Sequence, residues 1–272
     1  MKALRVGLST TTIEPVLTHG RLDGIGVYTS ALVQGLPRHG CEVNGYAFPP
    51  FGRAAMGKAF SAGRMLPRSY EAWSLRDLVC GARAPAAHDG GLLDLFHFTD
   101  YRVVRMNCPV VATLHDAVPI KYPEWTSPRL RRVKNFALKR AARKADHVIA
   151  LSQHAIAELV ECFSIDARRI TVVPCGVGAE WHRPVDESTV TAALQRHGLR
   201  RGYFLFVGTL QPRKNVDRII DAYLGLPPAL RRERQLVIVG RAGWRCEDTV
   251  RKLQAAMAEG DEVVWLNNVQ GE

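Results

Sequence analysis

Two adjacent cations, Arg213 and Lys214, follow a predicted strand and turn, a position at which proteins with parallel sheets often bind phosphate groups. They follow an apolar run, Phe-Leu-Phe-Val, which predicts a buried strand that ends at Gly208, where the chain must turn. Asn215 is a favourable N-cap for the next helix. This spacing directs two positive charges and free backbone N–H groups at one spot beyond the carboxyl end of a strand, which suits a diphosphate. The alternative is a pair of solvated cations that open a helix.

A diphosphate bound by Arg213 and Lys214 needs no metal ion to neutralise its charge as it leaves. The sequence also contains no Asp-x-Asp, which is the usual sign of a diphosphate held through a metal ion. We therefore expect neither a metal ion nor another cofactor in the reaction.

A glycine-rich segment, Gly24-Ile-Gly26, follows the first predicted strand at 4–9. Two glycines let a backbone approach a ligand closely and allow a tight entry into a helix. The motif is incomplete, because Thr29 stands where a dinucleotide fingerprint has its third glycine. No acidic residue ends the second strand either, since residues 47–49 read Ala-Phe-Pro. A nicotinamide-dependent enzyme is therefore disfavoured, and simple turn chemistry is the alternative for the two glycines.

His115 and Asp116 close the predicted strand 109–115, so they would lie at the crevice edge where ligands bind in parallel sheets. A histidine there is suited to move a proton or to donate a hydrogen bond to a substrate oxygen. Asp116 would orient the ring or bind a hydroxyl group. A histidine that only caps the next turn is the alternative.

The predicted helix 128–144 is strongly basic and carries the apolar residues Leu130, Val133, Ala137 and Ala141 at helical spacing. Its cations are Arg129, Arg131, Arg132, Lys134, Lys139, Arg140, Arg143 and Lys144. Such an amphipathic helix either rests its cationic face on anionic lipid or exposes that face to solvent.

Apolar runs that alternate with helical segments predict an α/β fold with parallel sheets. Strands are expected at 4–9, 42–48, 93–98, 109–115, 147–152, 170–174, 203–208, 235–240 and 262–266. Helices are expected at 27–36, 69–80, 128–144, 153–163, 215–225 and 246–258. Residues 1–180 would form the first domain, 181–201 a linker, and 202–272 the first half of a second domain.

The composition is that of an ordinary globular protein, with 272 residues, 47% of them hydrophobic, and a net charge of +11. The charge favours anionic partners, such as nucleotide phosphates or an acidic membrane face, while no recognisable motif supports a nucleic-acid binder. No apolar stretch approaches the ~18–20 residues of a membrane span, and the amino terminus is too polar for a signal peptide. Because six scattered cysteines are expected to be reduced and mostly buried, we expect a cytoplasmic protein.

Taken together, these segments resemble the retaining family 4 glycosyltransferases of the GT-B fold, which has two Rossmann-like domains. Gly24–Tyr28 resembles the glycine-rich loop of the family, and Val207–Asn215 is the most specific match. Further segments are similar to the bacterial mannosyltransferase-like branch, namely Phe98–Tyr101, Leu114–Pro119, Tyr122–Trp125, Ala150–Ser152 and Val173–Val177.

In the second domain, the resemblance implies that Gly208, Arg213 and Lys214 hold the nucleotide diphosphate and stabilise it as it leaves. The implied donor is a nucleotide-sugar, with GDP-mannose as the first candidate. The transferred hexose, mannose in that case, would keep its anomeric configuration. Members of the family build polysaccharides and lipopolysaccharide sugars, often on lipid carriers.

In the first domain, the resemblance implies that Gly24 and Gly26 let the donor phosphate or the acceptor approach the first helix. His115 would contact the transferred sugar near the reacting carbon, and Asp116 would bind substrate. The acceptor, a glycan or a lipid-linked glycan, would bind mainly to this domain, with catalysis between the two domains. The basic helix would then make a peripheral contact with the inner face of an anionic membrane.

One element of the family is not reached in this sequence. Its Glu-x7-Glu element, whose glutamates grip the donor sugar and ribose, has no match before the chain ends at Glu272. We therefore expect a chain truncated at the carboxyl end, with the first strand of its second domain on an open sheet edge, that is weakly active or inactive. The alternative to a transferase is an inactive remnant that acts at most as a binding module.

Overall fold

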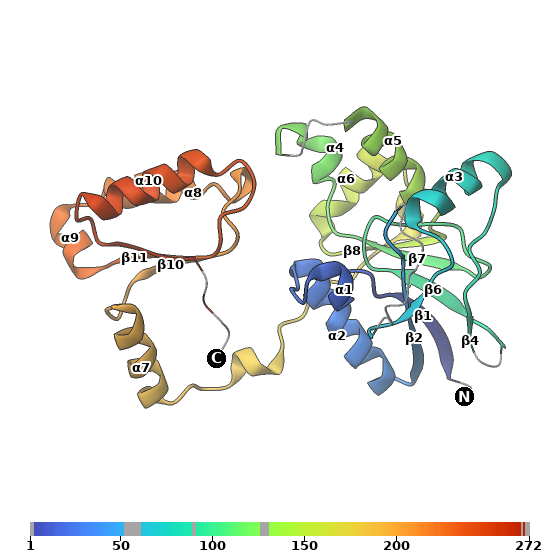
Figure 1. The fold of residues 1–272 in the computed structure, drawn as a ribbon, viewed down its shortest axis with the longest axis horizontal. Coiled ribbons are helices and arrows are strands. Elements are labelled where there is room, and N and C mark those ends of the chain that lie inside the picture. Colours follow the sequence, from blue (N-terminus) through green and yellow to red (C-terminus); the bar gives the residue numbers. More distant parts are fainter. Residues whose placement is uncertain (1–2, 52–60, 89–90, 126–130, 268, 270–272) are drawn as a thin grey trace. The chain divides into compact units, whose positions relative to one another are not determined.

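The computed structural model describes residues 3–51, 61–88, 91–125, 131–267 and 269. The chain divides into two compact units, Met1–Gly176 and Val177–Glu272, which are described separately below (Figure 1). The stretch 181–201, expected as a linker, contains a helix, α7 (Glu187–His197), that belongs to the second unit.

The first unit is built on a parallel sheet with the strand order β3-β2-β1-β6-β7-β8-β9 across its described residues. The strands are β1 (Leu4–Ser9), β2 (Cys41–Ala47), β3 (Arg64–Met65), β6 (Leu95–Phe98), β7 (Val110–Leu114), β8 (His147–Ala150) and β9 (Ile170–Val172). A separate antiparallel pair joins β4 (Ala87–His88) and β5 (Gly91–Leu92). The order reverses at β1, whose two neighbours are β2 and β6. Ligands of such sheets bind outside the carboxyl ends of the strands at this reversal.

Helices cover both faces of the sheet, with α2 on one side and α3, α5 and α6 on the other (Figure 1). The helices of this unit are α1 (Pro15–Thr18), α2 (Gly24–Arg38), α3 (Tyr70–Cys80), α4 (Val118–Lys121), η1 (Pro123–Trp125), α5 (Arg131–Ala142), α6 (Gln153–Phe163) and η2 (Ala167–Arg169). Ser69 and Ser152 cap α3 and α6 by accepting hydrogen bonds from the backbone N–H groups of Ala72 and Ala155. The expected start of the basic helix at Ser127-Pro128 lies outside the described residues.

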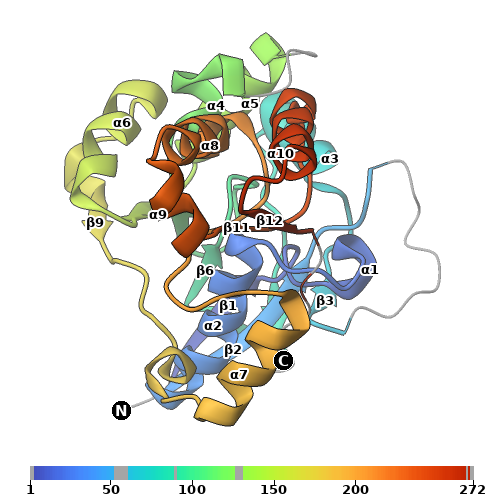
Figure 2. The same cartoon turned by 90° about the vertical axis from the view of Figure 1, so that its left-hand side faces the viewer.

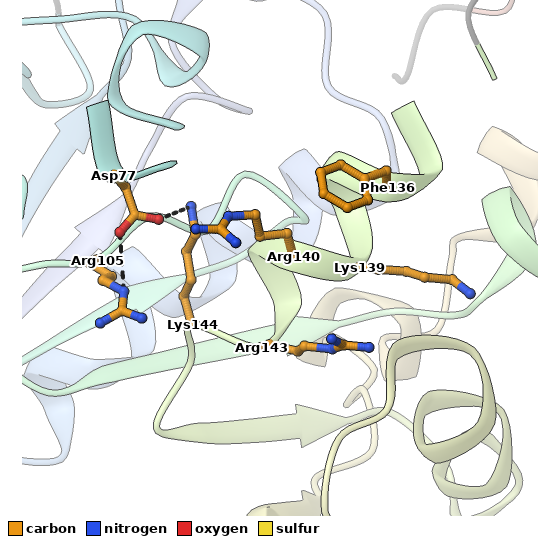
Figure 3. Close-up of a pocket in the computed structure, with 7 residues that line it drawn as sticks. All are labelled: Asp77, Arg105, Phe136, Lys139, Arg140, Arg143 and Lys144. Atoms are coloured by element: carbon orange, nitrogen blue, oxygen red, sulfur yellow. Dashed lines mark ion pairs between the residues drawn. The ribbon is translucent and has the colours of Figure 1, made fainter. Parts of the chain in front are cut away.

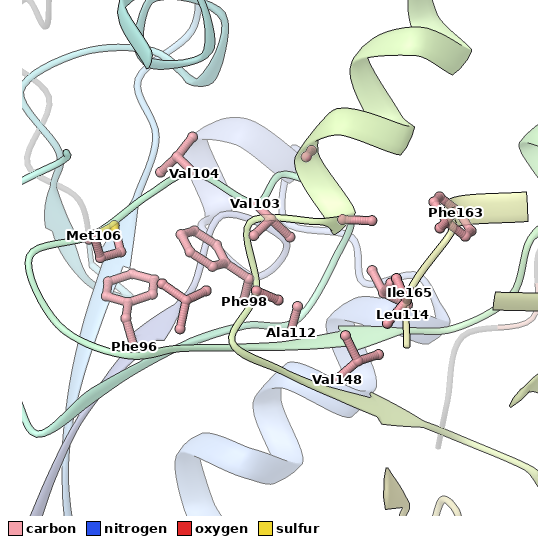
Figure 4. Close-up of a cluster of buried hydrophobic side chains, with 14 of the residues drawn as sticks. Phe96, Phe98, Val103, Val104, Met106, Ala112, Leu114, Val148, Phe163 and Ile165 are labelled. Carbon is pink, nitrogen blue, oxygen red and sulfur yellow. The ribbon is translucent and has the colours of Figure 1, made fainter. Parts of the chain in front are cut away.

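The core of the first unit lies between the sheet and the helices on one of its faces (Figure 4). Phe96 and Phe98 are fully buried, and their ring centroids are 4.5 Å apart. Leu114 on β7 and Phe163 at the end of α6 are also fully buried. Phe98 and Leu114 are the last residues of β6 and β7, and the polar residues Thr99 and His115 follow them directly at the carboxyl edge of the sheet.

The second unit is a three-stranded parallel sheet in the order β10-β11-β12 over the part of it that the structure describes. Its elements are η3 (Ala179–His182), α7, β10 (Phe204–Val207), η4 (Pro212–Lys214), α8 (Val216–Leu224), α9 (Pro228–Glu233), β11 (Leu236–Val239), α10 (Glu247–Ala258) and β12 (Val263–Leu266). Helices α8 and α10 lie side by side on one face of this sheet (Figure 2). Among the described residues β10 is an edge strand, as expected, and Leu205 and Val207 on it are exposed.

The predicted α/β fold with two parallel sheets is confirmed. Two other expectations are wrong in part. Of the six cysteines, all free thiols, Cys162 and Cys246 are buried, whereas Cys80 and Cys175 are exposed. On α5, Ala141 is buried as expected, but Val133 is 63% exposed. None of the described helices is long and apolar enough to cross a membrane.

Candidate functional site at the carboxyl ends of the strands

In the first unit, the amino end of α2 is fastened to the carboxyl edge of the sheet. Thr29 is completely buried, and its hydroxyl oxygen lies 2.8 Å from that of Thr99, which follows β6. It also lies 3.0 Å from the hydroxyl oxygen of Thr12, beyond β1. The residue that replaces a third glycine therefore ties the helix to the two strands between which the sheet order reverses.

The two glycines of α2 have different surroundings. A Cβ atom on Gly26 would lie 2.9 Å from the carbonyl oxygen of Thr12, so the close approach of these backbones requires glycine. A Cβ atom on Gly24 would meet nothing within 4 Å. The carboxylate of Asp23 caps the helix by accepting a 2.8 Å hydrogen bond from the backbone N–H of Gly26. Gly24 is therefore the exposed glycine at the start of α2, and its contact with a ligand stays a prediction.

His115 lies directly after β7 and is held from two sides. Its Nε2 is 2.8 Å from the carbonyl oxygen of Thr99, and its ring meets that of Tyr28 edge to face with centroids 5.3 Å apart. A carbonyl oxygen only accepts hydrogen bonds, so Nε2 carries a proton. In the neutral ring, Nδ1 is therefore an acceptor, and it becomes a donor only when the ring is protonated.

A buried polar chain next to His115 was not foreseen from the sequence. The Nε2 of His97 lies 2.8 Å from the hydroxyl oxygen of Thr113, which lies 3.0 Å from the Tyr28 hydroxyl. Burial, with a smaller repulsion from His115, lowers the pKa of His97 to about 4, so His97 is neutral at pH 7. Burial raises the pKa of Tyr28. The sequence did contain one signal of this buried polar chain, namely a histidine inside the otherwise apolar strand Leu-Phe-His-Phe.

The carboxylate of Asp116 accepts hydrogen bonds from two neighbouring residues of the first unit. Its Oδ1 accepts hydrogen bonds from the Tyr101 hydroxyl at 2.8 Å and from the backbone N–H of Val118 at 3.0 Å. Burial, together with the Asp116 charge, raises the pKa of Tyr101. These contacts shape the turn after His115, and they leave the role of Asp116 toward a substrate as a prediction.

A hollow of about 370 Å³ opens at the same edge of the first unit. It lies between α1, the ends of β1 and β2, and the start of α3. Its walls include Phe48, Phe51, Tyr70, His19 and Arg102. Aromatic walls with a few polar groups are typical of a small-molecule site.

In the second unit, β10 ends in a turn that requires glycine. Gly208 has a φ of +155°, in a region that L side chains rarely adopt. A Cβ atom on Gly240, which follows β11, would overlap the carbonyl oxygen of Gly208. The backbones after these two neighbouring strands therefore pack against each other without side chains between them.

Arg213 and Lys214 form the short helix η4 beyond this turn, and both are exposed. The Cε of Lys214 lies 4.0 Å from the position that a Cβ atom of Gly208 would take. The Nε of Arg213 donates to the side-chain oxygen of Gln211 at 3.3 Å, and no ion pair to either cation is present among the described residues. The structure thus brings Gly208, Arg213 and Lys214 together in the second unit.

The expected capping role of Asn215 is wrong. Asn215 precedes α8, but its φ of 56° and ψ of 36° place it in the left-handed region, and its side chain makes no capping hydrogen bond. Asparagine tolerates this backbone conformation better than most residues. Asn215 therefore ends η4 with a sharp turn, and the first backbone N–H groups of α8 are not capped by its side chain.

The residues 22–181 match the family model described as Glycosyltransferase Family 4. The chain belongs to this family. Residues 193–272 match a second model, described as Glycosyl transferases group 1. The family 4 match therefore spans the cluster around His115, and the group 1 match spans the cluster around Lys214.

Among the relatives of this family 4 chain is O-antigen chain mannosyltransferase B of Escherichia coli, 25% identical over 204 residues. That alignment covers 75% of this chain and 49% of the relative, so the chain spans about half the length of the curated relatives it matches. A crystal structure of Anabaena HepE in complex with UDP-glucose matches with a TM-score of 0.58 at 18% identity, covering 98% of this chain and 70% of that one. WaaG, a glycosyltransferase involved in lipopolysaccharide biosynthesis, matches with a TM-score of 0.56 at 16% identity over 97% and 70% of the two chains. These structures show the GT-B fold.

Proposed function

We propose that the chain transfers a hexose from a nucleotide-sugar to a glycan or a lipid-linked acceptor, in the synthesis of polysaccharide or lipopolysaccharide. Mannose, from GDP-mannose, is the first candidate for the hexose. Family membership supports sugar transfer, and the O-antigen mannosyltransferase relative supports mannose. The WaaG likeness supports a lipopolysaccharide product, and the HepE complex with UDP-glucose supports a nucleotide-sugar donor.

The observation that carries this proposal is the exposed pair Arg213 and Lys214 beside the glycine turn at Gly208. When the bond between the sugar carbon and the diphosphate oxygen breaks, its electron pair stays with the diphosphate. These two cations have no carboxylate partner among the described residues, so they are available to stabilise that charge. The turn beside Lys214 needs glycine at both Gly208 and Gly240, so no side chain from these two positions stands between the cation pair and a bound diphosphate.

We propose that the first unit holds the sugar and the acceptor. Because the Nε2 of His115 donates a hydrogen bond to the carbonyl oxygen of Thr99, the Nδ1 of the neutral ring can accept a hydrogen bond from a sugar hydroxyl. The acceptor would enter the hollow lined by Phe48, Phe51 and Tyr70, where aromatic side chains suit the apolar face of a sugar ring or a lipid chain. Retention of the anomeric configuration is part of the proposal.

A single-turnover reaction tests the proposal. The chain, in molar excess over GDP-mannose labelled in the hexose, is mixed with a synthetic α-mannoside that carries an alkyl chain, and UDP-glucose is tried in parallel. We expect weak transfer, seen by NMR as label on the acceptor in an α linkage, and a rate about a hundredfold lower still in Lys214→Ala. The matched control is Arg232→Ala, which removes an exposed cation from α9 near the amino end of β11.

Equal transfer by wild type and Lys214→Ala would contradict the proposed role of the cation pair. A β linkage in the product would contradict retention. A folded chain that neither binds nor consumes any nucleotide-sugar would favour the alternative of a binding module.

A further inference from the structure

A basic pocket lies in the first unit between α3 and α5, away from the residues described above. It has a volume of about 370 Å³ and is lined by Asp77, Arg105, Phe136, Lys139, Arg140, Arg143 and Lys144. Figure 3 shows Arg140 reaching toward Asp77 and Lys144, while Lys139 and Arg143 extend the other way. The inner part of the pocket is therefore formed by Asp77, Arg105, Arg140 and Lys144.

This inner cluster has an excess of positive charge. Asp77 is buried, and it is shared by the Nε of Arg105 at 3.1 Å and the Nζ of Lys144 at 2.9 Å. The Lys144 side chain is only 5% exposed. Three cations and one carboxylate leave a net charge of +2. The Arg105 side chain is 53% exposed, so water screens its charge, whereas the buried Lys144 ammonium and the buried Arg140 Nε are screened less and would be stabilised by an anion.

Arg140 adds an unused donor to the same cluster. Its Nε is buried and has no hydrogen-bond partner among the described residues. Lys144 lies in the turn just after α5, and it lines the same pocket as Arg140, so the two like charges repel each other. An anion between them would satisfy the donor and relieve the repulsion.

The pocket lies at a different edge of the sheet from the cluster around His115. Arg105 and Lys144 precede β7 and β8 in the chain, so they lie near the amino ends of these strands. His115 follows the carboxyl end of β7. The pocket is therefore separate from the proposed sugar site, and its use does not depend on the proposed transfer.

We propose that this pocket binds a phosphate group. A phosphate dianion matches the net charge of the inner cluster, and its oxygens accept the fork of donors that a guanidinium presents together with a lysine ammonium. The Phe136 side chain, 63% exposed, lines the same pocket and offers an apolar contact to whatever carries the phosphate. The phosphate belongs either to a small soluble molecule or to a lipid headgroup.

Two binding measurements on the full chain test this site. The first is a titration with inorganic phosphate, followed by the rise in melting temperature against potassium chloride of equal ionic strength. The second is co-sedimentation with phosphatidylcholine vesicles that contain or lack phosphatidic acid. The variant is Arg140→Gln, and the control is Arg132→Gln, which removes an exposed cation from the same helix outside the pocket.

We expect saturable phosphate binding that is about tenfold weaker in Arg140→Gln and unchanged in Arg132→Gln, because a charge-assisted hydrogen bond is lost. Asp77→Asn should bind phosphate more tightly than wild type, because the competing carboxylate is gone. The same pattern seen only with phosphatidic acid vesicles would support the site and assign the phosphate to a lipid. Equal effects of the Arg140 and Arg132 variants in both measurements, or no binding in either, would overturn the proposal.

Discussion

The Nε2 of His115 and the carbonyl oxygen of Thr99 are joined by a 2.8 Å hydrogen bond across the carboxyl ends of β7 and β6. This bond decides which nitrogen of the ring carries the proton, and it leaves Nδ1 as the acceptor of the neutral ring, the atom that we propose contacts the substrate. The edge-to-face contact with Tyr28 fixes the plane of the ring. His115 is thus oriented before any ligand binds, as a positioned acceptor is expected to be.

Replacing His115 with phenylalanine should slow transfer without weakening nucleotide binding. His115→Phe keeps a ring against Tyr28 but removes both nitrogens, so the contact to the sugar is lost. We expect kcat/KM for transfer to fall about tenfold or more. The control is His147→Phe, since His147 lies at the start of β8 and bonds to Thr171. Unchanged transfer by His115→Phe, with a circular dichroism spectrum like that of wild type, would refute a contact between His115 and the sugar.

His97 should make the stability of the chain depend on pH. Its pKa is about 4 in the folded protein, against about 6.5 in the unfolded chain. Between these values the unfolded chain binds more protons, so the free energy of unfolding falls as pH drops from about 6.5 to 4. Above pH 6.5 neutral His97 does not reduce the free energy of unfolding. Below pH 4 its protonation reduces that free energy by about 3 kcal/mol.

Urea unfolding at several pH values, with wild type and His97→Gln, measures this contribution of His97. The glutamine keeps a polar group near Thr113 but does not titrate. The two proteins should therefore differ in the slope of stability against pH between pH 4 and 6.5. Parallel slopes in that window would show that His97 is not held neutral by burial.

The two glycines of α2 should respond differently to alanine. Gly26→Ala places a Cβ atom 2.9 Å from the carbonyl oxygen of Thr12, so we expect a loss of about 1–3 kcal/mol in stability. Gly24→Ala has open space and sits in a helix, so its stability should be unchanged or rise by about 0.5–1 kcal/mol. Thermal and urea unfolding of both variants measure the difference. If a ligand contacts the amino end of α2, substrate affinity should fall in Gly24→Ala. An unaltered affinity would show that Gly24 does not contact the substrate.

Transfer should need no metal ion. If Arg213 and Lys214 stabilise the leaving diphosphate, excess EDTA should leave the single-turnover rate unchanged, and Mg²⁺ or Mn²⁺ should add nothing beyond the effect of ionic strength. The assay described for the proposed function measures this directly. Loss of transfer on chelation, with recovery on addition of Mn²⁺, would contradict the role given to the cation pair.

Nine strands could be predicted because each is a short apolar run between turn residues. The two-residue strands β3, β4 and β5 and the short helices α1, α4 and α9 were missed, because so few residues carry no periodic pattern. Helix α7 was missed, since Pro184 and Asp186 suggested a linker, although Val190, Ala193 and Leu194 recur at helical spacing. The error at Asn215 has a different cause. The residue type favours both a helix cap and a left-handed turn, and only the backbone decides between them.

The positions of Gly208, Arg213, Lys214 and His115 after strands could be predicted, because a strand end locates a side chain along the chain. The contacts that orient these side chains could not. Thr29 and Thr99 are 70 positions apart, and their hydroxyl contact follows from the packing of α2 on the sheet. Neither the sequence around Thr29 nor that around Thr99 indicates that these two residues contact each other.

The most direct test of the proposed function is calorimetric titration of the full chain, without metal, with GDP, UDP, GDP-mannose and UDP-glucose. Wild type, Lys214→Ala and Arg232→Ala are compared at one ionic strength, after circular dichroism has shown that each is folded. The proposed diphosphate site predicts that one nucleotide and its sugar conjugate bind to wild type and Arg232→Ala, and that binding is about tenfold or more weaker in Lys214→Ala. Equal binding by the two variants, or no binding of any nucleotide by folded wild type, would contradict it.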